Sequence, residues 1–137
     1  MSHTIKDITP PERSILSQLR WRPALYLGVK SLRNFEHMTN GYEFAMNIAK
    51  ESVNHIILPD MLNEYTAKYL NVPQNVRNAF GLIAEREPDD AKALDLFFDI
   101  LDSYLISLGY APIPVWDEAN NDMDVKYLEK EDPTWAG

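Results

Sequence analysis

The sequence contains no cysteine among its 137 residues. Disulfide bonds, thiolate zinc sites, iron–sulfur clusters and cysteine nucleophiles are therefore excluded. Glycine is also scarce, because five glycines spread along the chain cannot build a phosphate-binding loop or a dinucleotide fingerprint. The only histidines are His3, His37 and His55, and none has the spacing of a zinc-binding pair. We therefore predict no metal site and no cofactor.

Long hydrophobic runs are missing as well. The longest unbroken apolar run covers residues 24–27, whereas a transmembrane helix needs about 20 apolar residues. Residues 1–7 contain no apolar stretch of the kind that a signal peptide requires. We therefore expect a cytoplasmic protein that does not bind membranes.

Basic residues are scarce in the last third of the chain. The formal net charge is −8. Residues 1–86 contain ten basic and eight acidic side chains, whereas residues 87–137 contain three basic and thirteen acidic ones. A field of this sign repels nucleic-acid phosphates and anionic membranes and attracts basic surfaces. We therefore expect a protein partner with a basic surface, and no nucleic acid.

The apolar residues recur at steps of three and four, which predicts an all-α fold, a compact bundle of about five helices. The expected helices cover residues 10–21, 32–53, 59–70, 73–86 and 88–109, with a short connector over residues 24–30. Pro59 and Pro73 are expected in the first turns of the third and fourth helices, and the third helix is expected to bury Met61.

The domain organisation follows from the same pattern. Residues 1–110 form one helical domain. Residues 111–137 form an acidic C-terminal arm that is not an independent domain, and Pro112 and Pro114 exclude a helix at its start. The sequence leaves open whether this arm is ordered over the bundle or mobile.

Asp95, Asp99 and Asp102 share one face of the 88–109 helix, opposite its apolar stripe. Such a stripe is most often the solvated side of an amphipathic helix. The alternatives are a protein contact and a magnesium site, but no second acidic motif completes a metal cage. The three aspartates are therefore candidate partner-binding residues.

The arm interleaves aromatic and acidic side chains. Aromatic anchors supply contact energy, and carboxylates steer a basic partner and raise its association rate. The candidate partner-binding residues in the arm are Trp116, Asp117, Glu118, Asp122, Asp124 and Tyr127. In the alternative interpretation, which is compatible with the first, Trp116 and Tyr127 attach the arm to its own core.

Three motifs in order carry a family resemblance over residues 12–105: residues 22–32, residues 40–45 and residues 93–104. They resemble a group of small bacterial proteins in which an RPxMYLG…SL segment leads into a GYEFA helix and then into a DLFFxxLD helix. The chain departs from that group at residues 24–25, where the group has Gly-Met. It departs again at residues 78–81, where the group has a tryptophan-containing stretch, and residues 111–137 have no counterpart. Some members of the group resemble immunity proteins, which protect a bacterium from a toxin secreted by its own kind.

The resemblance implies an immunity protein that neutralises a bacterial toxin, and the charge distribution agrees with it. A toxin that cuts nucleic acid has a basic cleft, which an acidic inhibitor can fill as a phosphate mimic. We expect occlusion and electrostatic complementarity rather than enzymatic activity. The alternatives are a small enzyme that uses His37 and Glu43 in an interhelical pocket, and a structural or regulatory adaptor that forms a homodimer.

Overall fold

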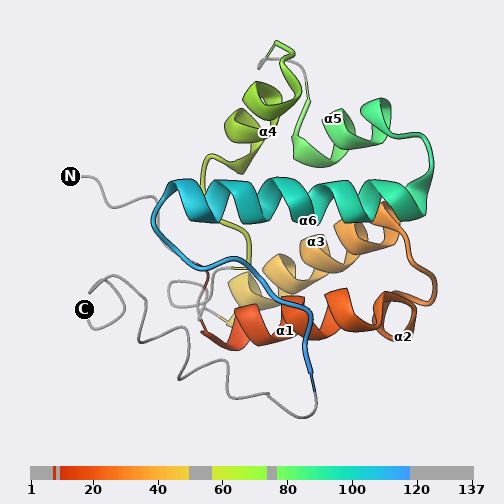
Figure 1. The fold of residues 1–137 in the computed structure, drawn as a ribbon. Helices are drawn as coiled ribbons and strands as arrows, with labels where there is room; N and C mark the ends of the chain where they lie inside the picture. Colours follow the sequence, from red (N-terminus) through yellow and green to blue (C-terminus); the bar gives the residue numbers. More distant parts are fainter. Residues whose placement is uncertain (1–7, 9, 50–56, 74–76, 118–137) are drawn as a thin grey trace.

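The computed structural model describes residues 8, 10–49, 57–73 and 77–117. These residues form six α-helices and no β-strand, so the predicted all-α fold is confirmed (Figure 1). The helices are α1 (Pro10–Trp21), α2 (Pro23–Leu27), α3 (Leu32–Ala49), α4 (Leu62–Leu70), α5 (Ala79–Arg86) and α6 (Asp90–Ser107). Within these ranges none of the helices has the length and apolar content needed to cross a bilayer.

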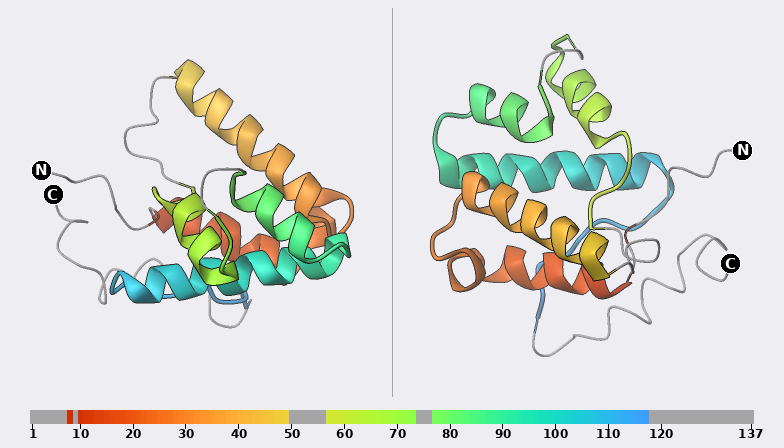
Figure 2. Two further views of the ribbon diagram at one scale, coloured as in Figure 1. Left: turned by 90° about the horizontal axis from the view of Figure 1, so that it is seen from above. Right: turned by 180° about the vertical axis from the view of Figure 1, so that it is seen from behind.

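Helix α6 lies at the centre of the arrangement. Helices α4 and α5 pack on one side of it, and α3 packs on the other (Figures 1 and 2). Helix α1 lies alongside α3 at the lower edge of Figure 1, and α2 follows it directly. Helices α3, α4 and α5 therefore all pack against α6.

The sequence of α6 explains its central position. The side chain of Asp89 caps the helix by accepting hydrogen bonds from the amides of Ala91 and Lys92, at 3.0 and 3.1 Å. Gly109 has a φ of 90°, a left-handed conformation that ends a helix at little cost only with glycine. The buried residues of α6 are Ala93, Leu94, Phe97, Phe98, Ile100, Leu101, Tyr104 and Leu105. Each large apolar side chain among them contributes about 1.5–3 kcal/mol by leaving water.

Aromatic rings join α6 to the helices on both sides. The ring centroid of Phe97 lies 5.1 Å from that of Phe35 on α3 and 5.2 Å from that of Phe80 on α5. Ring pairs at these distances add about 0.5–1.5 kcal/mol to the free energy of burial. Phe35, Phe80 and Phe97 therefore form the centre of the core.

The expected starts of α4 and α5 are wrong. Helix α4 begins at Leu62, after Met61, which has a left-handed φ of 69° and a side chain that is 51% exposed rather than buried. Helix α5 begins at Ala79, because the Asn78 side chain accepts a hydrogen bond from the Gly81 amide at 2.9 Å and so caps the helix. An asparagine cap satisfies a free amide of the first turn, which a proline some residues earlier cannot do.

The connector between α1 and α3 contains α2. Pro23 starts this helix and Gly28, with a φ of 85°, follows its last residue. Leu25 is 65% exposed, so the connector is a surface turn of helix and not a buried extended segment. Ser31 caps α3, since its hydroxyl accepts a hydrogen bond from the Asn34 amide at 3.0 Å.

Candidate partner-binding surface

After Gly109 the chain leaves α6 and runs across α1 in an irregular segment, residues 110–117 (Figure 1). Ile113 is 1% exposed and anchors this segment in the core. Pro112 and Pro114 exclude a helix here, and residues 110–116 form neither helix nor strand, so their carbonyl groups have no partner within a regular element. Buried carbonyl groups require donors, and here side chains must supply them.

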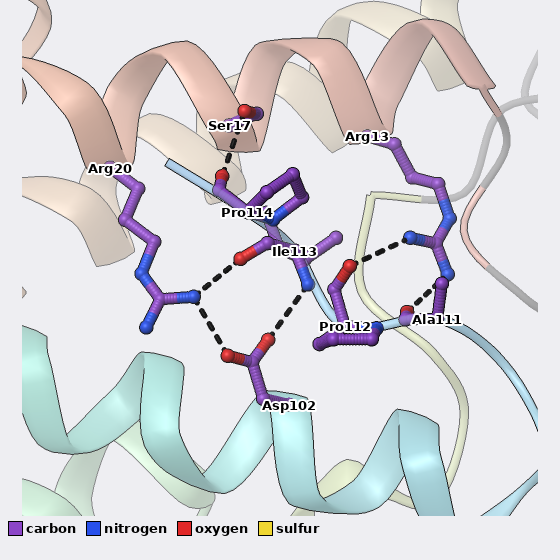
Figure 3. Close-up of polar contacts among 8 residues, drawn as sticks. All are labelled: Arg13, Ser17, Arg20, Asp102, Ala111, Pro112, Ile113 and Pro114. Carbon is purple, nitrogen blue, oxygen red and sulfur yellow. Dashed lines mark hydrogen bonds and ion pairs between the residues drawn. The ribbon is translucent and has the colours of Figure 1, made fainter. Parts of the chain in front are cut away.

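Helix α1 supplies most of these donors (Figure 3). The Arg13 guanidinium donates to the Ala111 carbonyl at 2.8 Å and to the Pro112 carbonyl at 3.4 Å. The Ser17 hydroxyl donates to the Pro114 carbonyl at 2.8 Å. Two consecutive turns of α1 therefore hold the start of the arm by its main chain.

Asp102 completes the contact from α6. One carboxylate oxygen accepts from the Ile113 amide at 2.8 Å, and the other pairs with the Arg20 guanidinium at 2.7 Å. Arg20 also donates to the Ile113 carbonyl at 2.5 Å and lies 5.1 Å above the Phe98 ring centroid. The four side chains Arg13, Ser17, Arg20 and Asp102 are called the arm clamp below.

The expectation that Asp102 lies on a solvated face is wrong, because its side chain is 20% exposed and fully engaged in the arm clamp. At 100° per residue, position 102 falls at the edge of the buried stripe, beside the direction of Phe98. The arm then covers that edge. Asp102 therefore holds the start of the arm.

Trp116 also belongs to the arm contact. Its amide donates to the Ser17 carbonyl at 3.2 Å, and its ring centroid lies 4.7 Å from that of Trp21. The Arg22 guanidinium lies 4.3 Å from the Trp21 ring centroid on the surface. Trp116 thus attaches the arm to its own domain, as the alternative interpretation states, while part of its ring stays exposed.

Asp95 and Asp99 form a different kind of surface, the outer acidic face of α6. The Asp95 carboxylate pairs with the Lys30 ammonium at 2.9 Å, and both side chains are exposed, by 62% and 40%. Asp99 is exposed and makes no ion pair within the described part of the chain. Lys92 is the only basic residue of α6.

The structure thus separates the predicted partner-binding residues. Asp102 and Trp116 meet at the arm clamp, and Asp95 and Asp99 lie on the outer acidic face. Asp117 is exposed at the end of the described segment. The remaining candidates, Glu118, Asp122, Asp124 and Tyr127, lie outside the described residues.

The sequence analysis did not single out Arg13, Ser17 and Arg20. Their spacing of four and three residues places them on one face of α1, which is the available signal. Spacing alone does not show that Arg13 and Ser17 are fully buried, at 0% exposure.

Glu12 is a second buried charge of α1, at 1% exposure. The Tyr42 hydroxyl of α3 donates a hydrogen bond to its carboxylate. Burial first, and then the hydrogen bond and the charge of Glu12, raise the pKa of Tyr42 well above its ordinary value. Tyr42 therefore remains a protonated donor to a buried carboxylate.

His37 and Glu43, the pair considered for acid–base chemistry, are not brought together. A cavity of about 300 Å³ between α3, α4 and α5 is lined by Glu43 but not by His37. His37 is exposed. Six residues of helix separate the two, which turns their side chains to different faces.

The chain matches no family model, and neither a curated protein nor a solved structure matches it. Evidence on function therefore comes from the arm clamp, the outer acidic face and the charge of the sequence.

Proposed function

We propose that the chain is an immunity-type inhibitor that binds a basic protein toxin in the cytoplasm and blocks its active-site cleft. The observation that carries this proposal is the outer acidic face of α6. Asp95 and Asp99 point into solvent on the side of α6 opposite its core stripe. Asp99 makes no ion pair within the described residues, and Asp95 pairs only with the exposed Lys30, so both carboxylates are accessible to a basic partner.

The arm clamp supports the same function. It holds the chain on α1 up to Trp116, and residues 118–137 then contain six acidic and two basic residues. A segment that starts from a fixed point loses less conformational entropy on binding than a free tail does. The clamp therefore anchors an acidic arm on the domain that presents the acidic face.

The proposed mechanism is steric occlusion assisted by electrostatic steering. A negative surface raises the rate of encounter with a basic cleft, and this effect weakens as salt screens the charges. Carboxylates that enter a cleft built for nucleic-acid phosphates occupy the place of the substrate. The inhibitor itself needs no catalytic group.

The first experiment is capture of the tagged protein from its native host, with elution by rising salt and identification by mass spectrometry. We expect one stoichiometric basic partner that is toxic when expressed alone and harmless when co-expressed with this chain. Recovery of the chain alone, or as a homo-oligomer, would contradict the inhibitor function.

The second experiment tests the acidic face with the captured partner. The double variant Asp95→Asn/Asp99→Asn should associate several-fold more slowly at low salt, with a flatter salt dependence and a nearly unchanged dissociation rate. Glu85→Gln is the matched control, because Glu85 is an exposed carboxylate on α5 with a side chain that is 66% exposed. An unchanged association rate of the double variant at low salt would show that the face does not steer the partner.

A further inference from the structure

Large apolar side chains lie exposed at both ends of the outer acidic face of α6. The exposed fractions are 65% for Leu25 in α2, 54% for Val29 just after it and 58% for Ile106 in the last turn of α6. A single exposed apolar side chain is normal, but a group of them on one side of a domain marks a place where another molecule binds. These three are called the anchor residues below.

Ile106 belongs to the same face of α6 as the two carboxylates. At 100° per residue its direction lies between those of Asp95 and Asp99, and the rise per residue places it about 10 Å beyond Asp99 along the helix. The outward face of α6 is therefore acidic in its first half and apolar at its end.

The other two anchor residues lie at the opposite end of this face, near the start of α6. Lys30 follows Val29 directly, and its ammonium group pairs with the Asp95 carboxylate at 2.9 Å. The Asn34 side-chain amide of α3 donates to the Leu27 carbonyl at 3.0 Å, which fixes the main chain of α2. A surface held in this way loses little conformational entropy when a partner covers it.

The length of this surface suits one protein partner. The helical rise separates Asp95 and Ile106 by about 16 Å along α6. A standard interface buries about 800 Å² on each partner, which is a patch roughly 30 Å across. One partner can therefore cover the carboxylates together with the anchor residues at both ends.

The charges on this side of the molecule indicate the kind of partner. Asp95 and Asp99 attract a basic protein and repel an anionic membrane. Lys30 neutralises Asp95 in part, but Asp99 makes no ion pair within the described residues. A two-fold contact between two copies of the chain would bring their own acidic faces together, where like charges repel.

The carboxylates and the anchor residues contribute to binding in different ways. Exposed ion pairs add little affinity, because water and salt screen them, but they raise the rate of encounter. Apolar side chains that leave water on binding supply most of the affinity, and they act mainly on the dissociation rate.

We propose that the anchor residues hold the basic partner of the outer acidic face by inserting into apolar recesses beside its lysine or arginine side chains. This inference rests on the proposed function and deepens it, because it states how the partner is held once the carboxylates have steered it. Asp95 and Asp99 then set the association rate, and Leu25, Val29 and Ile106 set the dissociation rate.

The test measures both rates with the purified basic partner from the capture experiment. Leu25→Gln and Ile106→Gln should each raise the dissociation rate about five- to tenfold, at low and at high salt alike. The association rate should stay within about twofold, because glutamine leaves the charge unchanged. Asp95→Asn/Asp99→Asn should show the reverse pattern.

Ile48→Gln is the matched control. Its side chain is 66% exposed, and it lies at the end of α3 that points away from α6 (Figure 2). This variant should change neither rate. All three glutamine variants replace exposed side chains and should unfold at the same urea concentration as the wild-type protein, so a faster dissociation is not an effect of folding.

The two proposals fail in distinguishable ways. Unchanged dissociation in both Leu25→Gln and Ile106→Gln would overturn the inference on the anchor residues and leave the toxin inhibition standing. An equal increase in the Ile48→Gln control would overturn it as well. Absence of any basic partner in the capture experiment would overturn both proposals.

Sedimentation velocity of the protein alone and co-sedimentation with phosphatidylglycerol vesicles test the other occupants of this surface. We expect a monomer that does not bind the vesicles. A dimer that Leu25→Gln or Ile106→Gln dissociates would assign the anchor residues to a second copy of the chain, and vesicle binding that these variants abolish would assign them to a membrane. Either result would overturn the proposal.

Discussion

Asp99 and Asp102 stand one helical turn apart on α6, but they belong to two electrostatically different regions. Asp102 accepts from the Ile113 amide and pairs with Arg20, with a side chain that is 20% exposed. Asp99 faces solvent without an ion pair in the described part of the chain. Position relative to the arm, and not residue type or spacing, therefore decides what a carboxylate of this helix does.

The same contrast holds between the cations of the two regions. Arg13 is fully buried and donates to main-chain carbonyls of the arm, whereas Lys30 is exposed beside Asp95. A buried polar group loses its bonds to water and must be paired, and an exposed one keeps them. The arm clamp should therefore determine stability, and the outer acidic face should determine association.

The largest expected effect is that of Arg13→Ala. The variant removes one of the largest fully buried side chains and leaves the Ala111 carbonyl without its donor. We expect the free energy of unfolding to fall by about 3 kcal/mol or more, measured by urea denaturation at pH 7.

Arg22→Ala is the control for this loss. Arg22 is exposed and contacts the ring of Trp21, so its removal should cost no more than about 1 kcal/mol. Equal losses in the two variants would show that the arm clamp does not contribute to stability.

The next effect compares the two aspartates directly. Asp102→Asn keeps an acceptor for the Ile113 amide but removes the anion that pairs with Arg20, and should cost about 1–2 kcal/mol. Asp99→Asn should change the free energy of unfolding by less than about 0.5 kcal/mol. If both variants unfold at the same urea concentration, the distinction between the two regions is wrong.

The helices that depend on periodicity could be predicted from the sequence. The stripe of Leu94, Phe97 and Leu101 predicted α6, and Ser31 and Gly109 marked helix ends correctly. These signals are local, since each depends on residues within a few positions of one another. The wrong start at Pro73 arose where two local signals, a proline and the Asn78 cap, competed, whereas at Pro59 the helix begins only after the left-handed Met61.

The arm clamp could not be predicted in the same way. Arg13 and Ala111 are separated by 98 positions, and Arg20 and Asp102 by 82. Periodicity assigns Asp102 to a face of its helix, but it contains no information on which segment covers that face. The two prolines of the arm do exclude a helix, so the carbonyl groups of the segment need donors from elsewhere, but the prolines do not indicate which side chains supply them.

A smaller effect on the free energy of unfolding should appear at alkaline pH, and it comes from the contact between Tyr42 and the buried Glu12 of α1. The raised pKa of Tyr42 means that the unfolded chain loses the tyrosine proton near pH 10 while the folded protein keeps it. The unfolded state then binds fewer protons, so the free energy of unfolding falls as pH rises above 10, by at most about 1.4 kcal/mol per pH unit for this group.

Tyr42→Phe removes this contribution. From pH 7 to 9, the free energy of unfolding should change with pH in the same way in the variant and in the wild-type protein. Above pH 10 it should fall less steeply in the variant. Denaturation curves at each pH measure both slopes. If the two proteins show the same pH dependence over the whole range, the Glu12 contact does not hold the Tyr42 proton.

The smallest expected effect on stability is that of Lys30→Met, which removes the ion pair on the outer acidic face. The Lys30–Asp95 pair lies in water, so its loss should cost less than about 0.5 kcal/mol, with little dependence on salt. The same variant frees the Asp95 carboxylate and makes the outer acidic face more negative. Association with a basic partner should therefore become faster at low salt while stability stays the same. A loss of stability above about 1 kcal/mol would place this pair with the arm clamp, since only a desolvated pair has an effect of that size.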